Sequence, residues 1–228
     1  MELGLKRKIL REEENMNRAQ IISFDMDGTL TDMAFVNSVW LRGVPELYAQ
    51  KNKISFEEAL FQVKHDYDKV GRERLEWYDL SYWLNKFEIN TTPEQILKSF
   101  VDKIRVFEDV HKLLKRLRDC GYRLIVLTNA RREFLDLEME QTGIKTYFEN
   151  IFSSPSDFKL IKNGTTVYEK VCIACQVSPT NMIHVGDDPD FDFEVPKRIG
   201  IRTFLLDRDE KRVGPDIVHN LEEFGRKI

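Results

Sequence analysis

The chain has 228 residues, of which 42% are hydrophobic and 32% charged, so it can bury a core as one domain with an insertion or as two small domains. Its net charge of −4 and the lack of a basic stripe argue against a nucleic-acid partner. No apolar run is long enough to span a bilayer or to serve as a secretory signal core, so we expect a cytoplasmic protein without a membrane partner.

Residues 1–19 are rich in charge, and we expect them to form an N-terminal extension without an assigned function. The apolar run Ile21–Phe24 follows and predicts a buried strand of a parallel sheet. At its end come two carboxylates, Asp25 and Asp27, and then Gly28, which tolerates backbone angles that other residues resist. Ligands of open α/β sheets bind beyond the carboxyl ends of the strands, and paired carboxylates suit Mg²⁺. This acidic turn is therefore the first candidate for a site.

Residues 33–104 differ from the rest of the chain, because they hold all three tryptophans and lack alternating β-branched runs. Apolar residues recur at helical spacing after Ser55, which is a favoured type of helix cap. The order Thr92-Pro93-Glu94 likewise predicts a helix start, with a cap, a proline and an acid. We therefore predict a small all-helical domain over residues 33–104, inserted after the first strand.

Strands and helices alternate after residue 104, which predicts a parallel sheet with helices on both faces. The predicted strands are residues 122–127, 151–153, 182–185 and 202–206, with an edge strand at 216–218. Gly121 and Gly143 mark helix ends, and Asn220 is placed to cap a closing helix. We therefore expect residues 20–32 and 105–228 to form a Rossmann-like α/β core, with helices on both faces of the sheet.

Cys172 and Cys175 have the C-x-x-C spacing of redox or zinc sites, but no second pair and no histidine pair completes a zinc site. With three cysteines in all, the chain has no disulfide framework. Both cysteines follow apolar residues at helical spacing, and Thr166-x-x-Glu169 predicts a capping box at the start of that helix. We interpret the two cysteines as small core residues.

Polar groups end three of the predicted strands: Asp25 and Asp27, Thr128 with Asn129, and Asp187 with Asp188 and Asp192. Because the carboxyl ends of parallel strands meet at one edge of a sheet, we expect these groups to surround one point. Their order resembles that of the haloacid dehalogenase-like hydrolases, which are mostly Mg²⁺-dependent phosphatases with an aspartate nucleophile. The resemblance spans about residues 20–208, and the inserted helices are similar in position and type to the cap of that family.

The family also carries a lysine between its second and last motifs. Lys162 fits this place, because the run from Lys162 to Gly186 matches the family pattern without a gap. Lys159 is the alternative, and the prolines that usually follow the lysine are absent here.

The resemblance implies a role for each of these groups. Asp25 would attack phosphorus, and Asp27 would protonate the leaving oxygen and then deprotonate water. Thr128 and Lys162 would act as catalytic groups that hold the phosphoryl oxygens. The expected substrate contacts are Thr128, Asn129, Lys162, Gly28 and Arg131. The expected Mg²⁺ ligands are the Asp25 and Asp187 side chains and the Asp27 backbone carbonyl, with Asp188 and Asp192 as further ligands or as supports.

Asp27 also bears on the type of reaction, since the dehalogenases and the enzymes of this family that cleave carbon–phosphorus bonds lack an acid there. We predict a phosphatase that acts on a small phosphorylated metabolite as a monomer or homodimer. A phosphomutase of sugar phosphates and a non-catalytic binding module on the same fold are the alternatives. We expect most polar and aromatic side chains of the insertion to be solvated or in its own core rather than on substrate: Trp40, Arg42, Lys64, His65, Arg72, Arg74, Trp77 and Tyr78.

Overall fold

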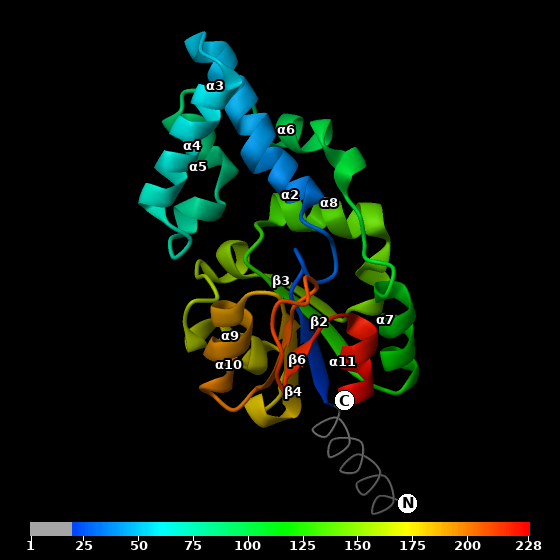
Figure 1. Ribbon diagram of the computed structural model, residues 1–228. Helices are drawn as coiled ribbons and strands as arrows, with labels where there is room; N and C mark the ends of the chain where they lie inside the picture. Colours follow the sequence, from blue (N-terminus) through cyan, green and yellow to red (C-terminus); the bar gives the residue numbers. More distant parts are fainter. Residues whose placement is uncertain (1–19) are drawn as a thin grey trace, which may run out of the picture.

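The computed structural model describes residues 20–228, and the predicted extension over residues 1–19 lies outside the described residues. A six-stranded parallel sheet forms the core, in the order β3-β2-β1-β4-β5-β6 (Figure 1). The strands are β1 Ile21–Phe24, β2 Arg123–Thr128, β3 Asn150–Ser153, β4 Met182–Gly186, β5 Arg202–Leu206 and β6 Ile217–Val218. The predicted Rossmann-like sheet, including its edge strand, is confirmed.

Helices cover both faces of this sheet, because side chains of a strand alternate between its faces. Ile22 and Phe24 of β1 pack on one face with α7, α8 and α11, whereas Ile21 packs on the other with α9 and α10 (Figure 1). These helices are α7 Val110–Asp119, α8 Arg132–Thr142, α9 Thr165–Ala174, α10 Val195–Lys197 and α11 Leu221–Lys227. Short 3₁₀ turns lie at Ile144–Tyr147 and Pro179–Asn181, and π-helical turns lie at Ser154–Phe158 and Pro189–Glu194.

The segment between β1 and α7 consists of helices joined by turns and loops, and it rises from the sheet edge (Figure 1). Its helices are α2 Ala34–Ser38, α3 Val44–Asn52, α4 Phe56–Val70, α5 Leu80–Lys86 and α6 Pro93–Ser99, with a π-helical segment Val39–Gly43 and 3₁₀ turns Leu75–Tyr78 and Val101–Lys103. Trp83 and Phe35 are fully buried in a hydrophobic cluster of this segment, to which Phe134 of α8 also belongs. The helical segment, called the insertion below, therefore has its own core, against which Phe134, Ala130 and Leu137 of the sheet domain also pack.

Helix caps explain where several of these elements begin. Ser55, Thr92 and Asn220 each accept a hydrogen bond from the backbone N–H three residues later, as predicted. The predicted capping box at Thr166 is wrong, because α9 begins after Gly164 and Thr166 lies inside the helix. Packing on the sheet decides where this helix begins and which side of it is buried. Its buried side carries Val167, Val171, Cys172 and Cys175, which confirms the cysteines as core residues.

No helix among residues 20–228 is long and apolar enough to cross a membrane.

Thr92→Ala tests the cap of α6, where Thr92 and Gln95 satisfy each other's backbone N–H groups. We expect the free energy of unfolding to fall by about 1 kcal/mol, as is typical for the loss of an N-cap. Urea denaturation measures the effect, with Lys98→Ala on the exposed side of the same helix as the control. An unchanged midpoint for Thr92→Ala would show that tertiary packing alone holds α6.

Candidate active site

The strand ends meet as expected. Phe24 of β1 lies between Val126 of β2 and Val185 of β4, so the residues that follow these three lie side by side. The Asp25 backbone N–H donates to the Val185 carbonyl at 3.0 Å, which extends the pairing by one residue. The central strand thus delivers Asp25 to the middle of the sheet edge.

Two glycines allow carboxylates to lie against the backbone at this edge. Gly28 has a φ of +79°, and a Cβ there would lie 2.3 Å from Oδ2 of Asp187. A Cβ on Gly186 would lie 2.4 Å from Cγ of Asp192. The Gly28 N–H donates to the Thr31 carbonyl at 2.7 Å, so, contrary to our expectation from the sequence, it is not free to donate to a substrate. Glycine is needed at this position because a side chain would collide with Asp187.

Lys162 lies at the centre of the site, 2% exposed. Its Nζ donates to Oδ1 of Asp25, to Oδ1 of Asp192 at 2.6 Å and to the Leu127 carbonyl at 3.2 Å. Although burial opposes its charge, Asp192 and Asp25 raise the pKa of Lys162 above the usual value, so the side chain is an ammonium. Lys159, the alternative, is exposed and donates to the Ser156 carbonyl.

Asp192 is the fixed counter-charge of this lysine. It also accepts from Nε2 of His184 at 3.0 Å and from the Asp188 N–H at 3.2 Å. Burial acts against ionisation, but Lys162 and His184 hold the pKa of Asp192 below its usual range. Since the oxygens of Asp192 are already bonded, the residue supports Lys162 and the start of the 189–194 turn.

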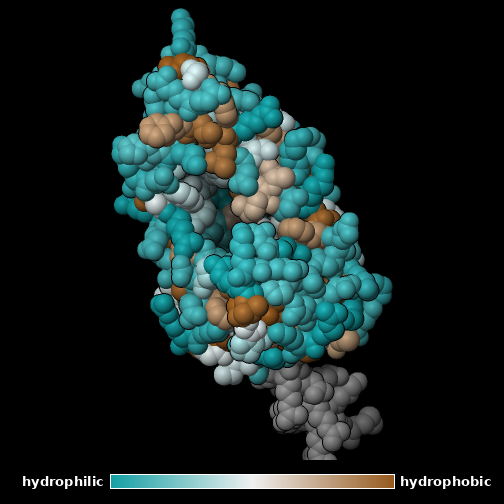
Figure 2. All heavy atoms as spheres, viewed as in Figure 1, coloured by the Kyte–Doolittle hydropathy of each residue, from teal (hydrophilic) through white to brown (hydrophobic). Residues whose placement is uncertain are grey.

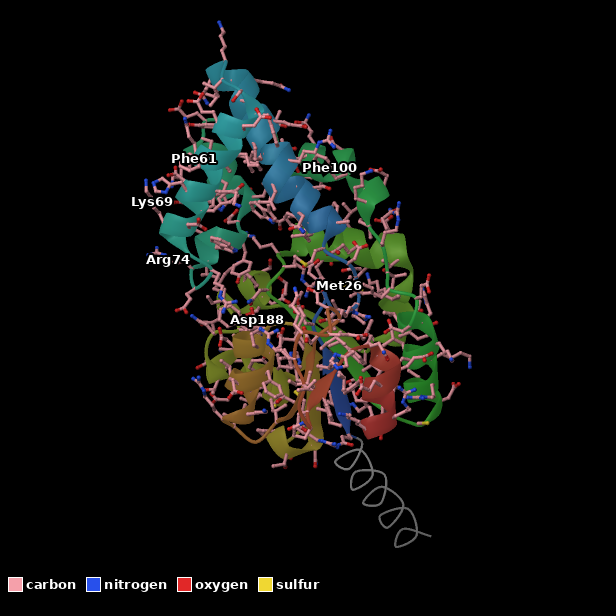
Figure 3. The ribbon with its side chains drawn as sticks, in the orientation of Figure 1. Met26, Phe61, Lys69, Arg74, Phe100 and Asp188 are labelled. Atoms are coloured by element: carbon pink, nitrogen blue, oxygen red, sulfur yellow. The ribbon has the colours of Figure 1, made fainter. Side chains whose placement is uncertain are left out.

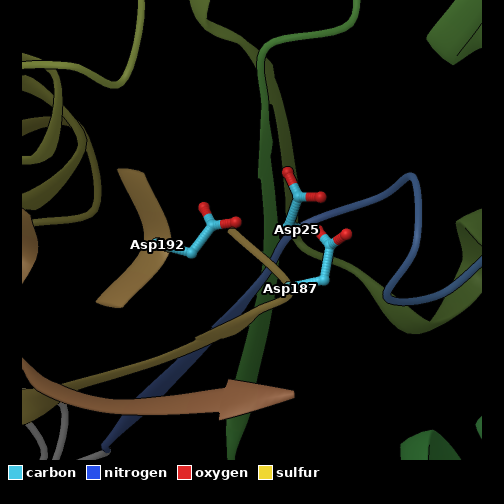
Figure 4. A group of neighbouring side chains, drawn as sticks. All are labelled: Asp25, Asp187 and Asp192. Carbon is cyan, nitrogen blue, oxygen red and sulfur yellow. The ribbon is translucent and has the colours of Figure 1, made fainter. Parts of the chain in front are cut away.

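Asp25, Asp187 and Asp192 bring three carboxylates to one point. Each can offer an oxygen within 4.8 Å of the others (Figure 4). Burial raises the pKa of Asp25, although Lys162 acts in the opposite direction. The Asp187 carboxyl opens to solvent, yet the surrounding protein and the charge on Asp192 raise its pKa to about 7. Because the oxygens of Asp192 are taken up by Lys162, His184 and the Asp188 N–H, Asp25 and Asp187 are the members of this cluster whose carboxylates fit a divalent cation.

Asp27 is paired with a residue that the sequence did not reveal. Burial raises the pKa of Asp27 to about 6, and Glu138 of α8 is its hydrogen-bonding neighbour. Within residues 20–228, Oδ1 of Asp27 and Oε2 of Glu138 are both buried without a hydrogen-bond donor, and a proton shared between the two carboxyls would satisfy both atoms. The other Glu138 oxygen accepts from Oγ1 of Thr31 at 3.0 Å. A single acid inside an amphipathic helix carries no sequence signal for this contact.

A cavity of about 460 Å³ opens between this sheet edge and the insertion, and Figure 2 shows the surface hollowed there. Its floor contains most of the predicted site residues: Asp25, Asp27, Thr128, Asn129, Arg131, Lys162, Asp187, Asp188 and Asp192. Asn129 is held in place, since its Oδ1 accepts from the Lys162 N–H at 2.9 Å and its Nδ2 donates to the Tyr78 hydroxyl at 3.3 Å. Arg131 pairs with Asp79 at 2.5 Å.

One arginine of the insertion contacts the core beside the cavity. Arg72 pairs with Asp188 and with Asp190, both at 2.5 Å, and its guanidinium lies 4.4 Å from the centre of the Phe191 ring. In Figure 3, Asp188 lies on the core, facing the end of the insertion that carries Arg74. Asp188 also caps the 189–194 turn through Oδ1, which accepts the N–H groups of Asp190 and Phe191. Asp188 therefore joins the insertion to the loop that carries Asp187.

A parallel sheet with a buried aspartate–lysine pair at its edge, facing a cavity under inserted helices, is typical of an α/β enzyme. The chain belongs to the haloacid dehalogenase-like hydrolases, whose family model matches residues 19–200. It is 29% identical over 191 residues to the GMP/IMP nucleotidase YrfG of Escherichia coli, with 81% of each chain covered. It is 25% identical to a phosphoglycolate phosphatase of Vibrio vulnificus over 82% of this chain and 83% of that one.

Solved structures agree on the fold. The crystal structure of an HAD phosphatase from Thermococcus onnurineus superposes with a TM-score of 0.81, covering 91% of this chain and 96% of that one at 23% identity.

Gly186→Ala tests the contact between this glycine and Asp192. The added methyl group would lie 2.4 Å from Cγ of Asp192, so the 189–194 turn must shift. We expect the free energy of unfolding to fall by about 1–3 kcal/mol, which is the usual cost of adding a methyl group to a well-packed site. Gly164→Ala is the control, since a Cβ there meets nothing within 4 Å. Equal urea midpoints for the two variants would contradict the steric argument.

The raised pKa of Asp187 predicts a pH dependence in a buffer that contains a chelator. The folded value is about 7 against an ordinary 3.8, so the folded protein holds this proton more tightly than the unfolded chain. The contribution to stability is therefore present at low pH and lost as the pH rises toward 7. We expect Tm to fall between about pH 5 and 7.5, and to fall less in Asp187→Asn. The fall in Tm of the unmodified protein should exceed that of Asp187→Asn by a few degrees at most, because the carboxyl opens to solvent. Equal falls in Tm for the two proteins would refute the prediction.

Proposed function

We propose that this hydrolase cleaves phosphate monoesters of a small metabolite through an aspartyl-phosphate, with Mg²⁺ as cofactor. The observation that carries the proposal is the contact between the Asp25 carboxylate and the Lys162 ammonium on the cavity floor. This contact supports the proposal, because a carboxylate that acts as the nucleophile would lie beside a cation that attracts phosphoryl oxygens. The names of the relatives, a nucleotidase and a phosphoglycolate phosphatase, support the same class of reaction.

In the first step, an oxygen of Asp25 attacks phosphorus and the bond from phosphorus to the ester oxygen breaks. The departing oxygen takes a proton from Asp27, whose pKa of about 6 suits an acid that works near neutral pH. Glu138, the hydrogen-bonding neighbour of Asp27, would orient this side chain.

In the second step, water adds to phosphorus, its proton passes to Asp27, and the bond from phosphorus to Asp25 breaks. Inorganic phosphate leaves, and both aspartates return to their starting state.

Positive charge is needed wherever phosphoryl oxygens lie. Lys162 supplies one charge, and the Thr128 hydroxyl, which lines the cavity, supplies a hydrogen bond. The carboxylate cluster fits Mg²⁺, which Asp25, Asp187 and the Asp27 backbone carbonyl would hold. When bound, this ion would neutralise charge on the phosphoryl group. Asp192 keeps Lys162 charged and oriented.

Phosphate release from an aryl phosphate tests the proposal, with Mg²⁺ or with a chelator. We expect release in Mg²⁺ only, and none from Asp25→Asn. Lys162→Met should lower kcat by about 10²–10³, the usual effect of removing one oxyanion-stabilising group. Lys159→Met is the matched control, because this lysine lies three residues away and is exposed.

Three outcomes would count against the proposal. Full activity in Asp25→Asn would exclude the aspartyl-phosphate, and full activity in chelator would exclude the metal. Conversion of a sugar phosphate to its isomer without phosphate release would identify a mutase instead.

A further inference from the structure

The cavity is built for more than a phosphate group. Trp40, Trp77 and Phe134 line it above the carboxylates, and Trp40 stacks on Phe134 with ring centres 5.6 Å apart and planes at 10°. Met33 and Leu41 also line it and are 39% and 38% exposed. Large apolar side chains left open inside a cavity indicate a ligand with a large, flat apolar part.

Two charged residues on the insertion side of the same cavity form no ion pair with any described residue. Lys64 and Asp68 are one turn apart on α4, line the cavity, and form no ion pair with each other or with any other residue of 20–228. Arg131 and Asp188, also at the cavity, are by contrast paired with Asp79 and Arg72. An ammonium and a carboxylate are thus both available to a ligand at the insertion side.

We propose that the cavity binds a nucleoside monophosphate, with its base against Trp40 and Trp77 and the polar edge of the base on Lys64 and Asp68. The proposal rests on the proposed function, which accounts for the phosphate end alone. Stacking on indole rings suits any nucleobase, because every base has a π-face.

The Lys64 and Asp68 pair favours guanine. Guanine presents an oxygen and a ring nitrogen that accept from a lysine, and beside them two N–H groups that donate to a carboxylate. Adenine presents an amino group where guanine has the oxygen, and a lone pair where guanine has a ring N–H. A carboxylate beside that lone pair is repelled, so adenine fits less well.

The comparison of GMP, AMP and ribose 5-phosphate as substrates tests the proposal. Ribose 5-phosphate is the matched control, since it keeps the reacting ester and lacks the base. We expect kcat/KM for GMP to exceed that for ribose 5-phosphate by at least about tenfold, the effect of one stacked base. AMP should lie between them.

Asp68→Asn and Lys64→Met should each lower the ratio of kcat/KM for GMP to that for ribose 5-phosphate by about tenfold, as lost hydrogen bonds to a base do. Lys69→Met is the matched control, because Lys69 is on the same helix, on its outer side (Figure 3), and pairs with Asp66. For Lys69→Met, the ratio of kcat/KM for GMP to that for ribose 5-phosphate should equal the ratio for the unmodified protein.

The outcomes separate this proposal from the proposed function. Equal kcat/KM for GMP and ribose 5-phosphate would overturn the base site and leave the phosphatase intact. Equal values for GMP and AMP would overturn the roles of Lys64 and Asp68. If no ester is hydrolysed at all, tryptophan fluorescence still decides the base site: guanosine without phosphate should quench it in the full chain, and no quenching would refute the proposal.

Discussion

A buried ammonium between two carboxylates is the interaction on which the rest of the site depends. Lys162 contacts Asp25 and Asp192, and all three are withdrawn from water. Such a cluster is unfavourable unless each charge has partners, because desolvation of ions is costly. His184 and the Asp188 N–H provide the partners of Asp192. The charge on Lys162 is thereby fixed before any substrate arrives, which is the preorganisation that phosphoryl transfer requires.

The sheet positions the polar residues of the site, and the insertion forms walls of the cavity above them. Because β1 lies between β2 and β4, Asp25, Thr128 and Asp187 come from three adjacent strand ends, and Lys162 joins them from the segment between β3 and α9. The insertion adds aromatic walls above them without contributing to the carboxylate cluster. Phe134 packs into the core of the insertion although it belongs to α8, so the two parts share packing as well as a cavity.

The sequence was informative where chemistry follows a strand end. Asp25, Thr128 and Asp187 each come directly after or at the end of an apolar run, so parallel pairing alone predicts their meeting. It was uninformative where a contact spans distant segments, as for Glu138 with Asp27 or Arg72 with Asp188. It misled at Thr166, because a local capping pattern yields to the packing of a whole helix face.

Asp188 connects the sheet domain to the insertion. It follows Asp187 directly, caps the turn that begins there, and binds Arg72 of the insertion. Together with the Arg131–Asp79 ion pair and the packing of Phe134, this contact fastens the insertion to the sheet domain. Because these contacts hold the insertion on the loop that carries Asp187, a sequence change elsewhere in residues 33–104 can reshape the cavity walls without disturbing the carboxylate cluster below them.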